Sequence, residues 1–162
     1  MGMTAFTLFH VALSLAGIFS GFIVVFGLLT GKRLDGWTAL FLVTTVLTSV
    51  TGFLFPFHKV MPSHILGVLS LIALVVAIFA RYMLQLAGGR RRSYVVSSVI
   101  ALYFNVFVLV AQLFMKVPAL KAMAPTQSEP PFKVTQLAVL VIFVALTIGS
   151  AKNFRDAQVR TA

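Results

Sequence analysis

Cysteine is missing from this 162-residue chain, and acidic residues are scarce: three Asp and Glu stand against thirteen Lys and Arg. The absence of cysteine excludes disulfide-built secreted domains and cysteine-ligated zinc or iron–sulfur centres. Charged residues make up only 10% of the chain, while 60% of it is hydrophobic and the mean hydropathy is +1.05. Because so little polar material cannot cover a water-soluble globule, the composition predicts an integral membrane protein.

The basic residues give the chain a net charge of +10, which in a soluble domain would suggest a nucleic-acid partner. Here they form short clusters at the ends of apolar runs, a position typical of residues that hold loops on the cytoplasmic side and contact anionic lipid. No basic stripe is interleaved with exposed aromatic residues, as single-strand binding would require. We therefore expect the lipid bilayer as the partner, and no nucleic acid.

Five apolar runs are each long enough to provide the about 20 helical residues that cross a bilayer core of about 30 Å. They cover approximately residues 5–29, 37–57, 62–83, 93–115 and 133–151. The first run is longer than the apolar part of a secretory signal and has no preceding Lys or Arg, so we expect it to remain as a membrane helix. The expected fold is all-α: residues 1–162 form one domain, a five-helix transmembrane bundle.

The distribution of basic residues predicts the orientation of these spans. With the N-terminus outside, nine Lys and Arg fall on the inner side and four on the outer side. The inner group is Lys32, Arg33, Arg81, Arg90, Arg91, Arg92, Lys152, Arg155 and Arg160, and the outer group is Lys59, Lys116, Lys121 and Lys133. Short loops follow the positive-inside rule, so the sequence predicts an N-out, C-in topology.

Small and polar residues mark the faces on which the helices are expected to pack. Gly17 and Gly21 lie four residues apart in the first run, and the second run is rich in threonine. Asn105 lies near the middle of the fourth run, where an amide without partners costs several kcal/mol. We therefore expect Asn105 to face the bundle interior, beside the hydroxyl groups of the second run.

The predicted topology also gathers polar side chains toward the outer side of the membrane. The hypothetical ligand pocket contains His10, His64, Tyr103, Asn105, Gln112, Gln136 and Glu129. The alternative is that these residues only join helices to one another. No catalytic residue is expected, because the chain offers no Cys, no carboxylate within an apolar run and no serine in a nucleophile-elbow context.

His10 and His64 are also the minimum needed for bis-imidazole ligation of one haem b. Gly67 lies one turn after His64, where a flat ring could approach. However, the two histidines differ in depth by roughly 4–5 Å at a rise of about 1.5 Å per residue. The inner side also has no second pair of histidines, so electrons could not cross the membrane through a second haem. We therefore predict no cofactor. No metal is expected either, since HxH and HExxH motifs are missing.

The longest connection covers residues 116–132 and contains four prolines, at positions 118, 125, 130 and 131. Proline reduces the entropy that a segment loses when it becomes ordered. The sequence leaves two interpretations open: a lid over the outer mouth of the bundle, or an ordinary connection between two spans.

Two segments, residues 101–112 (ALYFNVFVLVAQ) and residues 124–132 (APTQSEPPF), resemble parts of small uncharacterised bacterial inner-membrane proteins. The resemblance covers most of the chain and implies a bacterial inner membrane and a similar five-helix layout. It implies no activity, cofactor, partner or site residue.

Three hypotheses for function follow from these features. The first is a non-enzymatic protein that binds a ligand, a lipid or a partner in an outward-facing polar pocket, as an accessory subunit would. The second is a small permease or channel, which at five helices per chain would need a homo-oligomer to build a symmetric pore. The third is a single-haem or quinone-linked electron-transfer protein that uses His10 and His64. A homo-oligomer or a larger membrane complex is compatible with each.

Overall fold

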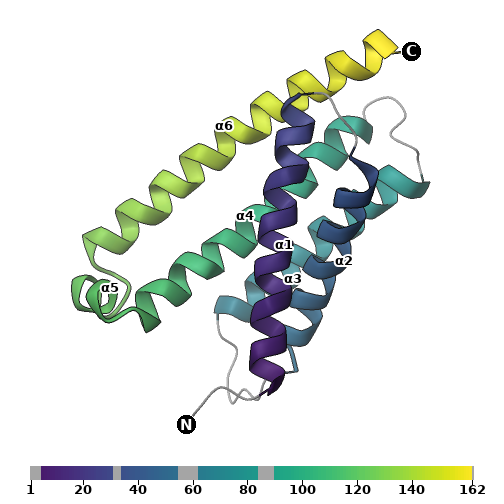
Figure 1. The fold of residues 1–162 in the computed structure, drawn as a ribbon. Helices are drawn as coiled ribbons and strands as arrows, with labels where there is room; N and C mark the ends of the chain where they lie inside the picture. The colour runs from purple at the N-terminus through teal and green to yellow at the C-terminus, as the bar shows by residue number, and fades with distance from the viewer. Residues whose placement is uncertain (1–4, 31–33, 55–61, 84–89, 162) are drawn as a thin grey trace.

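A computed structural model describes residues 5–30, 34–54, 62–83 and 90–161, and every regular element within them is helical (Figure 1). The helices are α1 (Ala5–Leu29), α2 (Asp35–Gly52), α3 (Pro62–Ile78), α4 (Arg90–Lys116), α5 (Pro118–Met123) and α6 (Pro130–Thr161). A short π-helical segment, η1 (Phe79–Met83), continues α3. The predicted all-α class is confirmed.

Four helical stretches are long and apolar enough to cross a membrane: Ala5–Leu29, His64–Tyr82, Arg92–Lys116 and Pro130–Lys152. They correspond to the first, third, fourth and fifth predicted runs. The second run corresponds to α2, which has 18 residues, begins at Asp35 and contains five threonines that lower its hydropathy. The end of that run, residues 55–57, lies outside the described residues. The membrane crossing of the second run, which would make five spans in all, and the N-out, C-in orientation therefore stay predictions.

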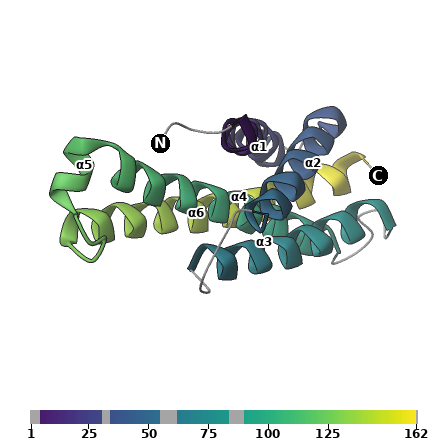
Figure 2. The ribbon, with the colours of Figure 1, turned by 90° about the horizontal axis from the view of Figure 1, so that it is seen from below.

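The helix α4 lies at the centre of the bundle, where it contacts α1, α3 and α6. On one side of it, α1 packs along α2, and α2 packs on α3. On the other side, α4 and α6 form a hairpin that extends well beyond α1, α2 and α3 and is closed at its far end by α5 (Figure 2). The polar interior described below is built by the four helices α1 to α4.

Three helices approach closely at Gly21 of α1. A Cβ atom at this position would lie 2.7 Å from Cδ1 of Leu102 on α4 and 3.0 Å from Cδ1 of Phe41 on α2. Both neighbours are buried, so they would have to shift to admit a larger residue. Gly21 thus allows the close crossing of α1, α2 and α4, as expected of a small residue on a packing face in a membrane.

The connection between α4 and α6 is an ordered cap on the end of the hairpin. The side-chain nitrogen of Gln127 donates a hydrogen bond to the carbonyl oxygen of Ala111 at 2.7 Å. Phe132 packs edge-on against Phe114, with ring centroids 5.4 Å apart, and Ala124 is fully buried. The segment lies at the far end of α4 and α6, away from α1, α2 and α3 (Figure 1). Of the two open interpretations, the ordinary connection is confirmed and the lid is wrong.

Candidate functional site

A cavity of about 110 Å³ lies between the first four helices. Its wall is built by His10 and Ser14 of α1, Thr48, Ser49, Gly52 and Phe53 at α2, His64, Leu66, Gly67 and Ser70 of α3, and Phe104, Asn105 and Val108 of α4. Three of the predicted pocket residues, His10, His64 and Asn105, thus face one space. Polar groups from all four helices reach it.

His10 is held by a hydroxyl group of the neighbouring helix. Its Nδ1 atom lies 2.7 Å from Oγ1 of Thr51, and that hydroxyl donates its own hydrogen to the carbonyl oxygen of Leu47 at 2.6 Å. Thr51 therefore accepts a hydrogen from Nδ1 of His10, which assigns the hydrogen of a neutral ring to Nδ1 and the lone pair to Nε2.

His64 is positioned by an aromatic contact. Its ring stacks on Phe53, with centroids 5.9 Å apart and an interplanar angle of 30°. A Cβ atom at Gly67, one turn later on α3, would lie only 3.0 Å from the Phe53 ring. Gly67 thus accommodates a flat ring, as the sequence indicated, but that ring belongs to Phe53.

Asn105 is 7% exposed and faces the interior, as predicted. Its Nδ2 atom, however, has no hydrogen-bond partner within the described part of the chain. The α2 hydroxyls that were expected to pair with it do not accept from it: Thr44 and Thr48 donate to the carbonyls of Leu40 and Thr44, both at 2.7 Å, and the Thr45 hydroxyl has no partner among the described residues either. Because a buried donor without an acceptor costs about 1–3 kcal/mol, Asn105 is the energetically costly group of this cavity.

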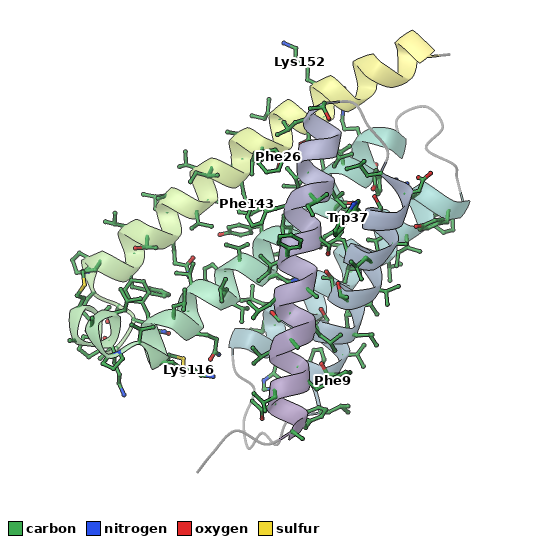
Figure 3. The ribbon with its side chains drawn as sticks, viewed as in Figure 1. Phe9, Phe26, Trp37, Lys116, Phe143 and Lys152 are labelled. Atoms are coloured by element: carbon green, nitrogen blue, oxygen red, sulfur yellow. The ribbon has the colours of Figure 1, made fainter. Side chains whose placement is uncertain are left out.

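The other four predicted pocket residues lie elsewhere. Tyr103 packs against Phe143 of α6, with ring centroids 5.6 Å apart, and the amide nitrogen of Gln136 donates to the Phe107 carbonyl at 3.2 Å. Figure 3 shows Phe143 pointing from α6 toward α1 and α4. Gln112 is half-buried outside the cavity wall. Tyr103 and Gln136 thus join α4 to α6 outside the cavity.

Glu129 also lies outside the cavity, just before the first residue of α6. Its carboxylate accepts hydrogen bonds from the backbone nitrogen and the hydroxyl of Thr126 and from the backbone nitrogen of Ser128. The Thr126 hydroxyl is the main reason that the pKa of this carboxyl lies below its usual range. Glu129 therefore organises the connection before α6.

The chemistry of the cavity is that of an uncharged polar site. No described carboxylate lines it, and no group of three His, Cys, Asp or Glu capable of holding a metal ion occurs among the described residues. The amide of Asn105 and the imidazole of His10 line it, and a bound cation would find no opposite charge among the described lining residues. A small neutral molecule with a hydrogen-bond acceptor fits this arrangement best.

Haem does not fit the cavity as it stands. A cavity of roughly 150 Å³ holds one benzene, a porphyrin is much larger than benzene, and this cavity measures about 110 Å³. In addition, Phe53 occupies the flat space against His64 and Gly67. Ligation of one iron by His10 and His64 would require α1 and α3 to separate.

A second polar cluster, which the sequence analysis missed, lies at the opposite end of the bundle. Arg81 in η1 is 2% exposed, forms an ion pair with Asp35 of α2 and donates a hydrogen bond to the Tyr94 hydroxyl at 3.0 Å. Its guanidinium carbon also lies 5.2 Å from the centroid of the Tyr94 ring. Arg81 follows Leu74 and Ala77 by seven and four residues, a helical spacing that would have indicated an inward side chain. This cluster ties α2, η1 and α4 together.

Comparison with known proteins does not assign the chain to a family. No family model, no curated protein and no solved structure matches it. The resemblance of residues 101–112 and residues 124–132 to small bacterial inner-membrane proteins therefore stays a prediction. What supports a function is the set of four candidate spans and the cavity between α1 and α4.

Proposed function

We propose that the chain crosses the membrane five times, with the N-terminus outside and the C-terminus inside. An odd number of crossings separates the termini, and the start of α1 and the end of α6 lie at opposite ends of the bundle (Figure 1). Lys116 and Lys152 likewise lie toward opposite ends of the α4–α6 hairpin (Figure 3). The 18 residues of α2 would extend about 27 Å at about 1.5 Å per residue, close to the bilayer core of about 30 Å. A bacterial inner membrane is proposed on the resemblance alone.

Reporter fusions test this topology. A reporter that is active only in the cytoplasm is expected to be active when fused after Ala162 and when inserted after Lys32, because both positions carry the inner basic residues. A reporter that is active only outside the cytoplasm is expected to work after Lys59. If the insertions after Lys32 and Lys59 report the same side, α2 does not cross the membrane.

We further propose that the protein is a non-enzymatic membrane protein that binds a small uncharged ligand in the cavity between α1 and α4. The observation that carries this proposal is the buried Nδ2 atom of Asn105, which lacks an acceptor beside a cavity of about 110 Å³. The Nδ2 atom lies near Gly17 and is closed to solvent, so the amide would turn toward the cavity to meet a ligand carbonyl or hydroxyl oxygen. The binding energy would then include the hydrogen bond that the protein leaves unmade.

A pair of matched probes tests the binding proposal. Cyclopentanone and cyclopentane have the same ring, but only the ketone has an acceptor. The apparent Tm of the detergent-purified protein is expected to rise with cyclopentanone more than with cyclopentane, because a ligand that binds the folded state stabilises it. The difference should vanish in Asn105→Leu and persist in Gln112→Leu, which alters an amide on the same helix outside the cavity. Equal responses to both probes, or an unchanged difference in Asn105→Leu, would exclude this site.

The electron-transfer alternative has one observation in its favour, since His10 and His64 line the same cavity. It makes a different prediction for the purified protein. Haem bound between these histidines would give a strong Soret absorption that both His10→Ala and His64→Ala remove. Because the cavity is smaller than a porphyrin, we expect a colourless protein, and a stoichiometric Soret band would reverse the order of the two proposals.

A further inference from the structure

A second hollow lies on the outer surface of the bundle between α3 and α4. It has a volume of about 550 Å³ and a mostly apolar lining, in which Ile72 and Val76 of α3 face Val96 and Ile100 of α4. Ile72, Val76 and Ile100 are partly exposed at the molecular surface. Because both helices are candidate membrane spans, this groove opens toward the hydrocarbon of the bilayer and not toward water.

One end of the groove is strongly basic. Arg92 lines it beside Ser93, in the first turn of α4, and Arg90 and Arg91 immediately precede them. Arg92 is exposed and makes no hydrogen bond or ion pair with any residue that the structure describes. In this it differs from Arg81, whose guanidinium is buried against Asp35 and Tyr94. The backbone N–H groups of a first helical turn also lack partners within the helix and favour an anion.

The length of the groove matches one leaflet of a bilayer. Its lining on α4 runs from Arg92 to Phe104, which is about 18 Å at about 1.5 Å per residue. Half of a hydrocarbon core of about 30 Å is about 15 Å. A molecule with its charged group at Arg92 would therefore reach the bilayer midplane at Phe104.

We infer that this groove binds an anionic phospholipid, with the phosphate at Arg92 and one acyl chain between α3 and α4. The positive end selects the headgroup charge, and the apolar remainder accepts the chain. This site meets the polar cavity between α1 and α4 only at Phe104, which lines both, and it does not depend on the ligand proposed there. It is also more specific than the general attraction of basic loops to the membrane surface, because it assigns one arginine and one groove.

Native mass spectrometry of the detergent-purified protein tests the site. The probes are phosphatidylglycerol and phosphatidylcholine with identical acyl chains. We expect phosphatidylglycerol to bind at least about fivefold more tightly, since one basic residue beside an anionic lipid contributes on that order. Arg92→Gln should remove this preference, and Arg92→Lys should keep most of it. Lys116→Gln, at the other end of α4, should leave it unchanged.

A second pair of variants tests the acyl-chain groove. Ile72→Trp places a large side chain in the groove, whereas Val75→Trp makes the same change at an exposed position of α3 outside it. We expect Ile72→Trp to reduce phosphatidylglycerol binding several-fold and Val75→Trp to have little effect. Equal binding of both lipids, an unchanged preference in Arg92→Gln, or equal effects of the two tryptophan variants would overturn the inference.

Discussion

Asp35→Ala is expected to destabilise the protein more than Arg81→Met, although Asp35 is the exposed member of the pair. The side chain of Asp35 is 75% exposed and that of Arg81 1%. Removing Asp35 leaves a buried guanidinium without its counter-charge, a change that costs about 3–5 kcal/mol in a fully buried pair. Because water reaches the Asp35 side of the contact, we expect a smaller loss of about 2 kcal/mol.

Arg81→Met should cost only about 1 kcal/mol, because the carboxylate that it leaves behind is hydrated and the methionine fills the apolar part of the site. The double variant should therefore be more stable than Asp35→Ala alone. The measurement is the free energy of unfolding of all three variants and the wild type in one detergent, analysed as a double-mutant cycle. If Asp35→Ala has no larger effect than Arg81→Met, the buried ion pair does not hold this end of the bundle together.

Asn105→Leu is expected to raise the free energy of unfolding of the ligand-free protein, whereas the Asp35 and Arg81 substitutions lower it. Leucine has nearly the same volume as asparagine plus one methyl group, and the cavity beside it can accept the difference. The substitution removes a buried donor that lacks an acceptor, which should raise the free energy of unfolding by about 1–2 kcal/mol. We expect a higher apparent Tm together with loss of the cyclopentanone response. Stability would thus be gained where binding is lost, as is common when a binding site carries unsatisfied polar groups.

Gln136→Met is the matched control for Asn105→Leu. Its amide nitrogen donates to the Phe107 carbonyl, while its Oε1 atom has no partner among the described residues. Loss of the hydrogen bond, worth about 0.6 kcal/mol between membrane helices, opposes removal of the unpaired oxygen, so this variant should be stabilised less than Asn105→Leu. A loss of stability in both variants would mean that ordered water already satisfies the Asn105 amide.

The helices could be predicted from the sequence because a bilayer demands long apolar runs, and such runs are visible residue by residue. The depth of a side chain could be estimated in the same way. Asn105 was correctly predicted to lie inside the bundle, because an amide that faced lipid at mid-membrane depth would have no hydrogen-bond partner. His10 and His64 were grouped with it on depth, and the structure places all three around one cavity.

Depth does not determine the direction in which a side chain points. Tyr103 is two residues from Asn105 and therefore faces α6 on the other side of α4. Gln136 has a similar depth but bonds to α4 outside the cavity. Arg81 was interpreted as a basic anchor from its charge, while its spacing from Leu74 and Ala77 placed it on the packing face. These positions depend on which helices are neighbours, and apolar runs alone do not predict that.

Three spans of this bundle are longer than the bilayer core is thick. Those in α1 and α4 have 25 residues each and that in α6 has 23, or about 37 Å and 35 Å at about 1.5 Å per residue, against a core of about 30 Å. Tilting accommodates such excess length, and because α4 and α6 run obliquely to α1 in Figure 1, the three spans cannot all tilt by the same amount. A thicker bilayer would favour a more upright α4–α6 hairpin, and its angle to α1 would change with the lipids around it. The crossing of α4 with α1, where Asn105 lies beside Gly17, is therefore the part of the bundle most sensitive to bilayer thickness.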